Sequence, residues 1–417
     1  MIVLRIGLII LLVLAGLVGL LALIWLILDK IVFKGKDGTP DSAAHFVAMK
    51  AVSLWRRFSQ ELTVDREKLD GLEPPFIVLC NHVCFYDFYY MEELLKDYKP
   101  AYIINHHVTS APFLRHISKK AGMIPKKMFY PDTAAVKMLR TIRAGYPVVV
   151  FPEGRLSIDG RFGTIVESAA SVYKKLGVPL VLARTQGSYF TYPKWRGKFY
   201  RGKVNIGVKR VITPEELKQM SVKEIERAIE EALRYNASVD PINRFTQKNR
   251  AHGLETLLYR CADCGALYTT ASRGCELYCT ACGKAHRLDE EYHFTDEIGT
   301  IPDYYDRIKE IERAELDALD LKAEVNVKVF PDKNGRVRKE KGVCTLSKEA
   351  FSYRSDEIEF TVPTEKIPAL AFSCNKLFEL YYNNDQYYFY PTEHPRQVLR
   401  WSLIIDLLRE ERARVEE

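Results

Sequence analysis

The chain of 417 residues contains 47% hydrophobic and 28% charged residues, a composition typical of globular proteins and unlike that of disordered segments. Its length predicts two or three domains. The formal net charge of +7 is modest for this length. It suits contact with an anionic membrane or with phosphorylated substrates. The sequence shows no basic aromatic face, so we expect no binding of nucleic acid.

An apolar stretch without any charge covers residues 6–28. At ~1.5 Å rise per residue, a helix of this length crosses the ~30 Å hydrocarbon core of a bilayer, so residues 1–28 are predicted to hold one transmembrane helix. A secretory signal is the alternative, but the stretch is too long and no small-residue cleavage site follows. Lys30, Lys34 and Lys36 follow it. The positive-inside rule therefore predicts a single-pass protein of the cell membrane whose body faces the cytoplasm.

Apolar residues recur at helical spacing between residues 41 and 62, which predicts an amphipathic helix. Its apolar face could lie on a membrane surface or pack on the following domain. We slightly favour packing on the domain.

From residue 29 to residue 250, short apolar runs alternate with helical patterns, which predicts an α/β domain. The expected strands cover 76–80, 101–105, 148–151 and 180–183, with another from Lys203. The expected helices cover 91–97, 133–144 and 164–176, with another from Thr213.

Asn81 and His82 directly follow the first of these strands, and Asp87 stands five residues after the histidine. α/β folds place reactive groups at the ends of strands. A carboxylate that accepts from Nδ1–H fixes the imidazole tautomer and leaves Nε2 free to take a proton. The pattern therefore predicts a general base, His82, oriented by Asp87. On this motif alone, an incidental surface histidine and aspartate are equally plausible.

Two further motifs follow in the chain. Phe151-Pro152-Glu153-Gly154 breaks a predicted strand, and Val178-Pro179 opens another. Together with the first motif, in this order and spacing, they resemble the glycerophospholipid acyltransferase family, which includes 1-acylglycerol-3-phosphate acyltransferases. The resemblance covers roughly residues 62–187. It implies an α/β acyltransferase core with His82 and Asp87 as the catalytic pair, and it places the family's Glu-Gly motif on Glu153 and Gly154.

The sequence departs from the family at two places that bear on the acceptor. Arg155 directly follows Gly154, where the commonest members carry threonine, and this version looks more like the acyltransferase part of the 2-acylglycerophosphoethanolamine acyltransferases. The second departure lies in the stretch from Gly122 to Lys127, which carries Lys126 and Lys127 where the family has an arginine. The motif thus favours lysophosphatidylethanolamine as acceptor. We weigh the three cations more heavily, because they favour the terminal phosphate of lysophosphatidic acid.

Acyl transfer from a thioester or acyl phosphate to an alcohol needs a base, donors for the developing oxyanion and anchors for phosphate. The donor would be acyl-CoA or acyl-carrier protein, and the acceptor a lysophospholipid taken from the membrane. The residues expected to bind substrate are Asn81, Lys126, Lys127, Glu153, Gly154 and Arg155. A solvated loop explains the two lysines equally well. Cys84 would suit an acyl-cysteine route, but an ordinary buried thiol is expected.

Two Cys-x2-Cys-Gly turns follow, Cys261 to Cys264 and Cys279 to Cys282, separated by 14 residues. Such turns place two thiolates each on one metal, so residues 255–290 are predicted to form a zinc ribbon. Four thiolates would fill a tetrahedral shell, which makes the zinc ion structural. Disulfides are the alternative, but cytoplasmic thiols stay reduced.

The last part of the chain is predicted to begin with a linker helix within residues 291–321. Short strands over 325–330, 342–346, 350–353, 357–362, 377–382 and 386–390 follow, with a final helix at 394–409. This β-rich module, residues 322–417, resembles a pleckstrin-homology-like or GRAM-like barrel. No basic cluster stands out in its loops, so we favour an interaction module without a lipid site. The class that competes with an enzyme is a non-catalytic membrane adaptor whose acyltransferase core is a relic, and the presence of both His82 and Asp87 argues against it.

Overall fold

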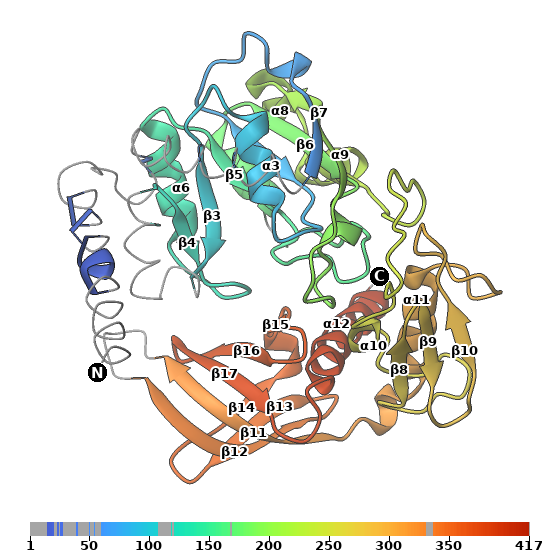
Figure 1. Cartoon of the computed structure of the whole chain (residues 1–417). Coiled ribbons are helices and arrows are strands. Elements are labelled where there is room, and N and C mark those ends of the chain that lie inside the picture. The colour runs from blue at the N-terminus through green and yellow to red at the C-terminus, as the bar shows by residue number, and fades with distance from the viewer. Residues whose placement is uncertain are drawn as a thin grey trace, which may run out of the picture.

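The computed structural model (Figure 1) describes residues 15–20, 23–24, 26–27, 39–40, 50, 54, 60–106, 118, 121–166, 169–330 and 337–416. Among these residues, no helix is both long and apolar enough to cross a membrane. Most of the apolar stretch at 6–28 lies outside the described ranges, and so does most of the amphipathic helix predicted at 41–62. The end of that helix was predicted wrongly. Residues from Gln60 onward form a strand that pairs in parallel with a later strand, which requires an extended backbone.

The α/β domain is built on a seven-stranded sheet in the order β1-β7-β6-β2-β5-β3-β4, in which only β6 and β7 are antiparallel neighbours. Its strands are β1 (Gln60–Asp65), β2 (Ile77–Cys80), β3 (Ala101–Asn105), β4 (Ile124–Lys126), β5 (Val148–Val150), β6 (Leu180–Gln186) and β7 (Gly202–Ile212). Its helices are α3 (Asp87–Leu94), α6 (Ala134–Arg143), α7 (Ala169–Leu176), α8 (Pro214–Gln219) and α9 (Val222–Leu233), with short turns η2 (Glu67–Leu69) and η3 (Tyr189–Thr191). The α/β architecture is confirmed. The sequence analysis missed strand β1, the three-residue strand β4, which contains a proline, and helix α9.

The central strand β2 is buried along its whole length. Ile77 and Leu79 belong to the core shared with α6, α7 and α9, whereas Val78 and Cys80 belong to the core shared with α3. Successive side chains of a strand point to opposite faces. A strand covered on both faces must therefore be apolar throughout, which explains the run in the sequence. The polar residues come only after the strand has left these two cores.

The middle of the chain forms a small three-stranded antiparallel sheet, β8 (Thr270–Arg273), β9 (Glu276–Cys279) and β10 (Ala285–Arg287). The short α10 (Leu254–Leu257) precedes it, and α11 (Ile301–Ala314) and η4 (Leu316–Ala318) follow. The predicted linker helix therefore ends earlier than expected. From Leu321 onward, buried and exposed residues alternate, and this period of two is typical of a strand with one covered face.

The C-terminal module is a seven-stranded antiparallel sheet in the order β14-β13-β12-β11-β17-β16-β15. Its elements are β11 (Leu321–Phe330), β12 (Arg338–Leu346), β13 (Ala350–Ser355), β14 (Glu359–Pro363), η5 (Thr364–Lys366), β15 (Ala371–Ser373), β16 (Leu377–Tyr382), β17 (Asp385–Pro391) and α12 (Gln397–Glu416). The predicted β-rich region with a closing helix is confirmed. The three-residue β15 was not predicted.

A third cluster of buried residues joins the three parts of the molecule. It includes Phe190 of η3, Leu277 of β9 and Trp401 of α12. The fully buried carboxylate of Glu312 on α11 accepts from Arg400 Nε at 3.0 Å and lies 3.2 Å from Arg260 Nη1. The C-terminal module is thus packed against the rest of the chain, with β15 and β16 on the side that faces the α/β domain (Figure 1).

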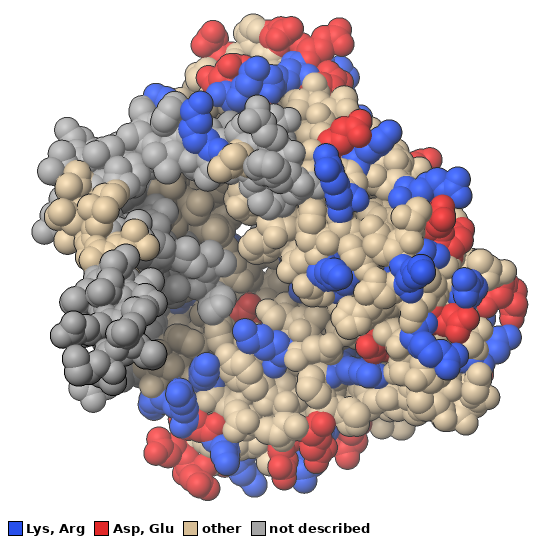
Figure 2. All heavy atoms as spheres, viewed as in Figure 1, with Lys and Arg blue, Asp and Glu red and all other residues tan. Residues whose placement is uncertain are grey.

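Basic and acidic side chains lie interspersed over the described part of the face in Figure 2. This distribution agrees with the modest net charge of the chain.

Candidate active site

His82 and Asp87 lie together at the end of β2. The Nδ1 atom of His82 is 3.0 Å from Oδ2 of Asp87. The turn between β2 and α3 makes this contact possible, because it returns the chain by one short loop to the first residue of the helix. The spacing seen in the sequence therefore forms the predicted pair.

The carboxylate of Asp87 is held by several donors at once. The backbone N–H groups of Val83 and Cys84 donate to its Oδ2 atom at 2.7 and 2.8 Å, and the Ser188 hydroxyl donates to Oδ1 at 3.2 Å. The carboxylate is fully buried. Donors of this kind fix the direction of the carboxylate. Ser188 was missed by the sequence analysis, since it lies on the segment after β6.

The imidazole of His82 lies between protein and solvent. Its ring stacks on Phe151 with a centroid distance of 4.1 Å, and 21% of the side chain is exposed. With Nδ1 directed at Asp87, Nε2 has no hydrogen-bond partner among the residues that the structure describes. A histidine so oriented can accept a proton from an incoming hydroxyl group.

Glu153 binds the backbone of the catalytic turn. Its Oε1 atom accepts from the N–H of His82 at 2.7 Å, and Oε2 accepts from the N–H of Gly163 at 2.8 Å. Burial raises the pKa of this carboxyl group to about 8, and the two backbone donors oppose that shift only in part. The structure thus makes Glu153 a residue that positions His82. Both of its oxygens already have protein partners.

Gly154 adopts a backbone conformation that requires glycine. Its φ is +67°, and an added Cβ would lie 2.9 Å from Val166 Cγ2. Any other residue would strain the turn that carries Glu153 and Arg155.

Asn81 connects two strands. Its Oδ1 atom accepts from the N–H of Thr185 at 2.8 Å, and its Nδ2 donates to the carbonyl of the same residue at 3.0 Å. The side chain is fully buried. The structure therefore places it in support of the strand end, with both polar atoms used.

Arg155 reaches the C-terminal helix. Its Nη2 donates to Oδ2 of Asp406 on α12 at 2.6 Å, with 29% of the arginine side chain exposed. A guanidinium carries five N–H donors, so this contact leaves donors for a further anion. Lys194, absent from the sequence predictions, is a second cation nearby. Burial lowers its pKa to about 8, the charge of Arg155 adds to the lowering, and its Nζ lies 3.5 Å from the ring centroid of Phe372.

The two lysines after β4 serve their own loop and the C-terminal module. Lys126 Nζ donates to the carbonyls of Lys127 and Tyr130 at 2.7 Å and lies 3.5 Å from Asp132. These contacts engage all three of its donors. Lys127 Nζ donates to the carbonyl of Asn384 at 3.3 Å. None of these contacts involves His82 or Arg155.

Cys84 has the environment of a buried thiol. Burial raises its pKa well above the ordinary value, and the charge of Asp87 raises it further. Its sulfur contacts the carbonyl of Tyr192 at 3.9 Å. A thiol in this state is a poor nucleophile.

A separate cluster gathers Cys261, Cys264, Cys279 and Cys282. All four sulfur atoms lie within 4.8 Å of one another, and the pairs 261/282 and 264/279 are each 3.8 Å apart. Four ligands at ~2.3 Å from a tetrahedral zinc ion would stand about 3.8 Å apart. The geometry of the donor set therefore fits zinc.

Known proteins are similar in sequence to the part of the chain that carries His82. Residues 58–183 match the model of the Acyltransferase family. This part of the chain resembles the glycerophospholipid acyltransferase family. The small sheet β8–β10 with its four cysteines and the C-terminal module lie outside the matched residues.

Curated relatives match about a third of the chain. The 1-acyl-sn-glycerol-3-phosphate acyltransferase BAT2, chloroplastic, of Brassica napus is 26% identical over 149 residues, which cover 34% of this chain and 42% of the relative. LPAT1, chloroplastic, of Arabidopsis thaliana is 27% identical over 152 residues, which cover 34% and 41%. The chain thus spans about two fifths of the length of these relatives.

A solved structure also aligns, the 1-acyl-sn-glycerophosphate acyltransferase PlsC of Thermotoga maritima. The alignment covers 45% of this chain and 78% of that protein, with 21% identity and a TM-score of 0.39.

Proposed function

We propose that the protein transfers a fatty acyl group to the free hydroxyl of a lysophospholipid, with 1-acylglycerol-3-phosphate as the preferred acceptor. The donor would be acyl-CoA, acyl-carrier protein or an acyl phosphate. The observation that carries the proposal is the contact of 3.0 Å between His82 Nδ1 and Asp87 Oδ2. It directs Nε2 outward as a general base.

In this mechanism His82 takes the proton of the acceptor hydroxyl as the oxygen attacks the acyl carbonyl carbon. Asp87 keeps the imidazole in the required tautomer and stabilises the imidazolium that forms. The proton then passes to the leaving group of the donor. Glu153 acts through His82, because it holds the backbone of that residue.

The preference for lysophosphatidic acid now has a different basis. Lys126 has no free donor and Lys127 faces the C-terminal module, so two of the three cations no longer support it. Arg155, with Lys194 nearby, remains a candidate for binding phosphate. The names of the relatives, all 1-acyl-sn-glycerol-3-phosphate acyltransferases, favour the same acceptor. Lysophosphatidylethanolamine stays the alternative because of the Glu-Gly-Arg motif.

The proposal is tested with purified protein, labelled acyl donors and both acceptors. His82→Ala should lower turnover by about 10² to 10⁴ and leave the fold intact, because a positioned base is worth that much. His252→Ala provides a matched control, since His252 is exposed and lies outside the site. Equal turnover by a well-folded His82 variant would refute the mechanism and favour a non-catalytic adaptor. A higher rate with the ethanolamine lipid would refute the choice of acceptor.

We also propose that Cys261, Cys264, Cys279 and Cys282 bind one structural zinc ion. The ion would supply folding energy to the small sheet β8–β10, and the closed set of four thiolates leaves no position for a substrate. Elemental analysis should find about one zinc per chain. Cys282→Ser should lose it, whereas Cys275→Ser should keep it, because Cys275 lies outside the cluster. An ordered ribbon in metal-free protein would overturn this assignment.

We further propose that residues 6–28 anchor the protein in the cell membrane as a single span, with the body in the cytoplasm. The uncharged sequence of this stretch supports the anchor, and a lipid acceptor requires membrane access. For the C-terminal module, the strand order and the closing α12 support a pleckstrin-homology-like fold.

A further inference from the structure

A cavity of about 310 Å³ lies between the α/β domain and the C-terminal module. One wall consists of Met128, Phe129 and Tyr130, from the loop after β4. The other comes from residues 361–363, 366–369 and 379–383 of the module. Neither part of the chain encloses this space alone. Cavities of this size at domain boundaries are typical of small-ligand sites.

Apolar side chains form most of the cavity surface, among them Phe129, Ile367, Ala369 and Leu380. The polar lining residues include Lys366, Glu379 and Asn383. The Tyr381 hydroxyl is buried and has no hydrogen-bond partner among the described residues. The small volume favours a single hydrocarbon chain over a lipid with two chains. Burial of such a chain would be driven by the hydrophobic effect.

The cavity adjoins the edge of the sheet that carries His82. A Cβ added at Gly154 would lie 3.4 Å from both Met128 Cε and Phe129 Cε1, so these two side chains pack against the turn next to Glu153. Glu379, which also lines the cavity, accepts from Asn105 Nδ2 at 3.5 Å, at the end of β3. β2, β3 and β5 are parallel, and their ends therefore meet at this one edge.

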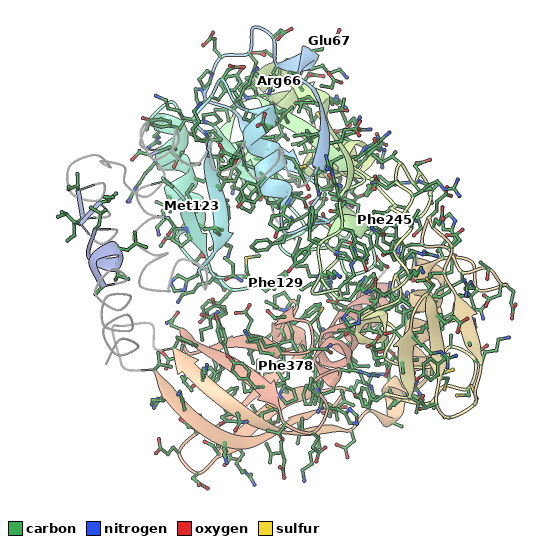
Figure 3. The ribbon with its side chains drawn as sticks, viewed as in Figure 1. Arg66, Glu67, Met123, Phe129, Phe245 and Phe378 are labelled. Atoms are coloured by element: carbon green, nitrogen blue, oxygen red, sulfur yellow. The ribbon has the colours of Figure 1, made fainter. Side chains whose placement is uncertain are left out.

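Phe129 is held at the boundary by an unusual backbone. Its φ is +55°, a conformation that bulky residues rarely adopt and that costs free energy. Figure 3 shows it between the α/β domain and the module that contains Phe378. Tyr130, the next residue, stacks on Tyr381 with a centroid distance of 5.2 Å. The loop is thus fixed as a wall shared by the cavity and the catalytic turn.

We propose that this cavity binds the hydrocarbon chain of a fatty acyl group whose polar end lies at His82. The inference rests on the proposed acyl transfer and adds the C-terminal module to the substrate site. The sequence favoured a module without a lipid site, because no basic cluster stands out in its loops. A chain site at the domain boundary needs none. The chain belongs either to the acyl donor or to the lysophospholipid.

The first test measures kcat/KM over a series of chain lengths, from octanoyl to stearoyl. One arm varies the acyl-CoA with a fixed lysophosphatidic acid, and the other varies the lysolipid with a fixed donor. Ala369→Phe fills the cavity, since Ala369 is 5% exposed and lines it. It should shift the preference to shorter chains in one arm. For the longer chains, kcat/KM should fall by up to about fourfold per excluded methylene. Leu380→Ala should shift it to longer chains. Ala413→Phe, an exposed position on α12, should change neither.

The second test detects binding without turnover. Fatty acyl-CoA and lysophosphatidic acid, each with a diazirine at the methyl end of the chain, are photolysed with wild-type protein and with His82→Ala. Mass spectrometry should locate the label at residues 128–130 or 361–383, and the probe that labels identifies the source of the chain. Labelling without turnover by wild type would refute the acyltransferase proposal and retain the cavity as a chain site. Turnover with label elsewhere, and no shift in chain preference for either variant, would overturn this inference alone.

Discussion

The turn after β2 and the turn after β5 lie side by side at one edge of the sheet, yet different contacts hold them. In the first, Asp87 accepts from the ring of His82 and from two backbone groups, all within five residues of itself. In the second, Glu153 binds the N–H of a residue 71 positions earlier, and Arg155 binds Asp406, 251 positions later. The first turn is organised mainly by local contacts, with one distant donor, Ser188. The second turn joins distant parts of the chain.

The two turns therefore have different roles, one in the reaction and one in positioning. The local turn contains the atoms that would react. The β5 turn aligns the backbone of His82 through Glu153 and connects the site to α12 through Arg155. We therefore expect changes in the first turn to affect turnover and changes in the second to affect binding and stability.

The largest effect is expected for Asp87→Asn. An amide of the same shape can orient the imidazole wrongly and cannot stabilise the imidazolium, so kcat should fall by about 10² to 10⁴. Steady-state kinetics with lysophosphatidic acid measure this. Ser188→Ala removes only the 3.2 Å contact to the other oxygen, and should cost much less. Similar losses in both variants would show that Asp87 acts only through its burial.

Arg155→Ala should raise the KM for lysophosphatidic acid by roughly tenfold to hundredfold. A charge-assisted contact to phosphate is worth about 1.5 to 3 kcal/mol, and the KM for the acyl donor should change less. Asp406→Asn is the control, because it weakens the partner and keeps the arginine. If both variants raised the acceptor KM equally, Arg155 would only connect the two domains and would not bind the phosphate.

Glu153→Gln should lower the free energy of unfolding by about 1 to 3 kcal/mol. The amide has one acceptor, so it leaves one of the backbone N–H groups of His82 and Gly163 unpaired. Denaturant unfolding of the purified protein measures the loss. A variant as stable as wild type but with low kcat would show that Glu153 takes part in the reaction itself.

The last prediction concerns the pH dependence of stability. Burial raises the pKa of Glu153 from 4.5 to about 8, so the folded protein binds this proton more tightly than the unfolded chain. Its contribution to stability is fully present below pH 4.5 and is lost as the pH rises through about 8. The difference between wild type and Glu153→Gln should therefore decline in that window, by at most ~1.4 kcal/mol per pH unit. A difference that grew with pH would reverse the sign of the shift.

The sequence by itself determined the features that depend on residues close together in the chain. The apolar run of β2, the five-residue spacing of His82 and Asp87 and the two cysteine turns were all readable, because short-range geometry decides each of them. The predicted β-rich module was readable as well, since its strands alternate with a period of two.

Only the tertiary structure decided which distant residues these local features contact. The three cations after β4 and β5 looked like one phosphate site, but Arg155 binds α12, and Lys126 and Lys127 bind their loop and the C-terminal module. The support of Asp87 by Ser188 and the cavity beside Phe129 depend on segments that meet only in the folded chain. Residue types and spacing specify a local turn. The partner of a long side chain depends on which distant surfaces pack together to bury their apolar faces. The residues around that side chain in the sequence do not determine this packing.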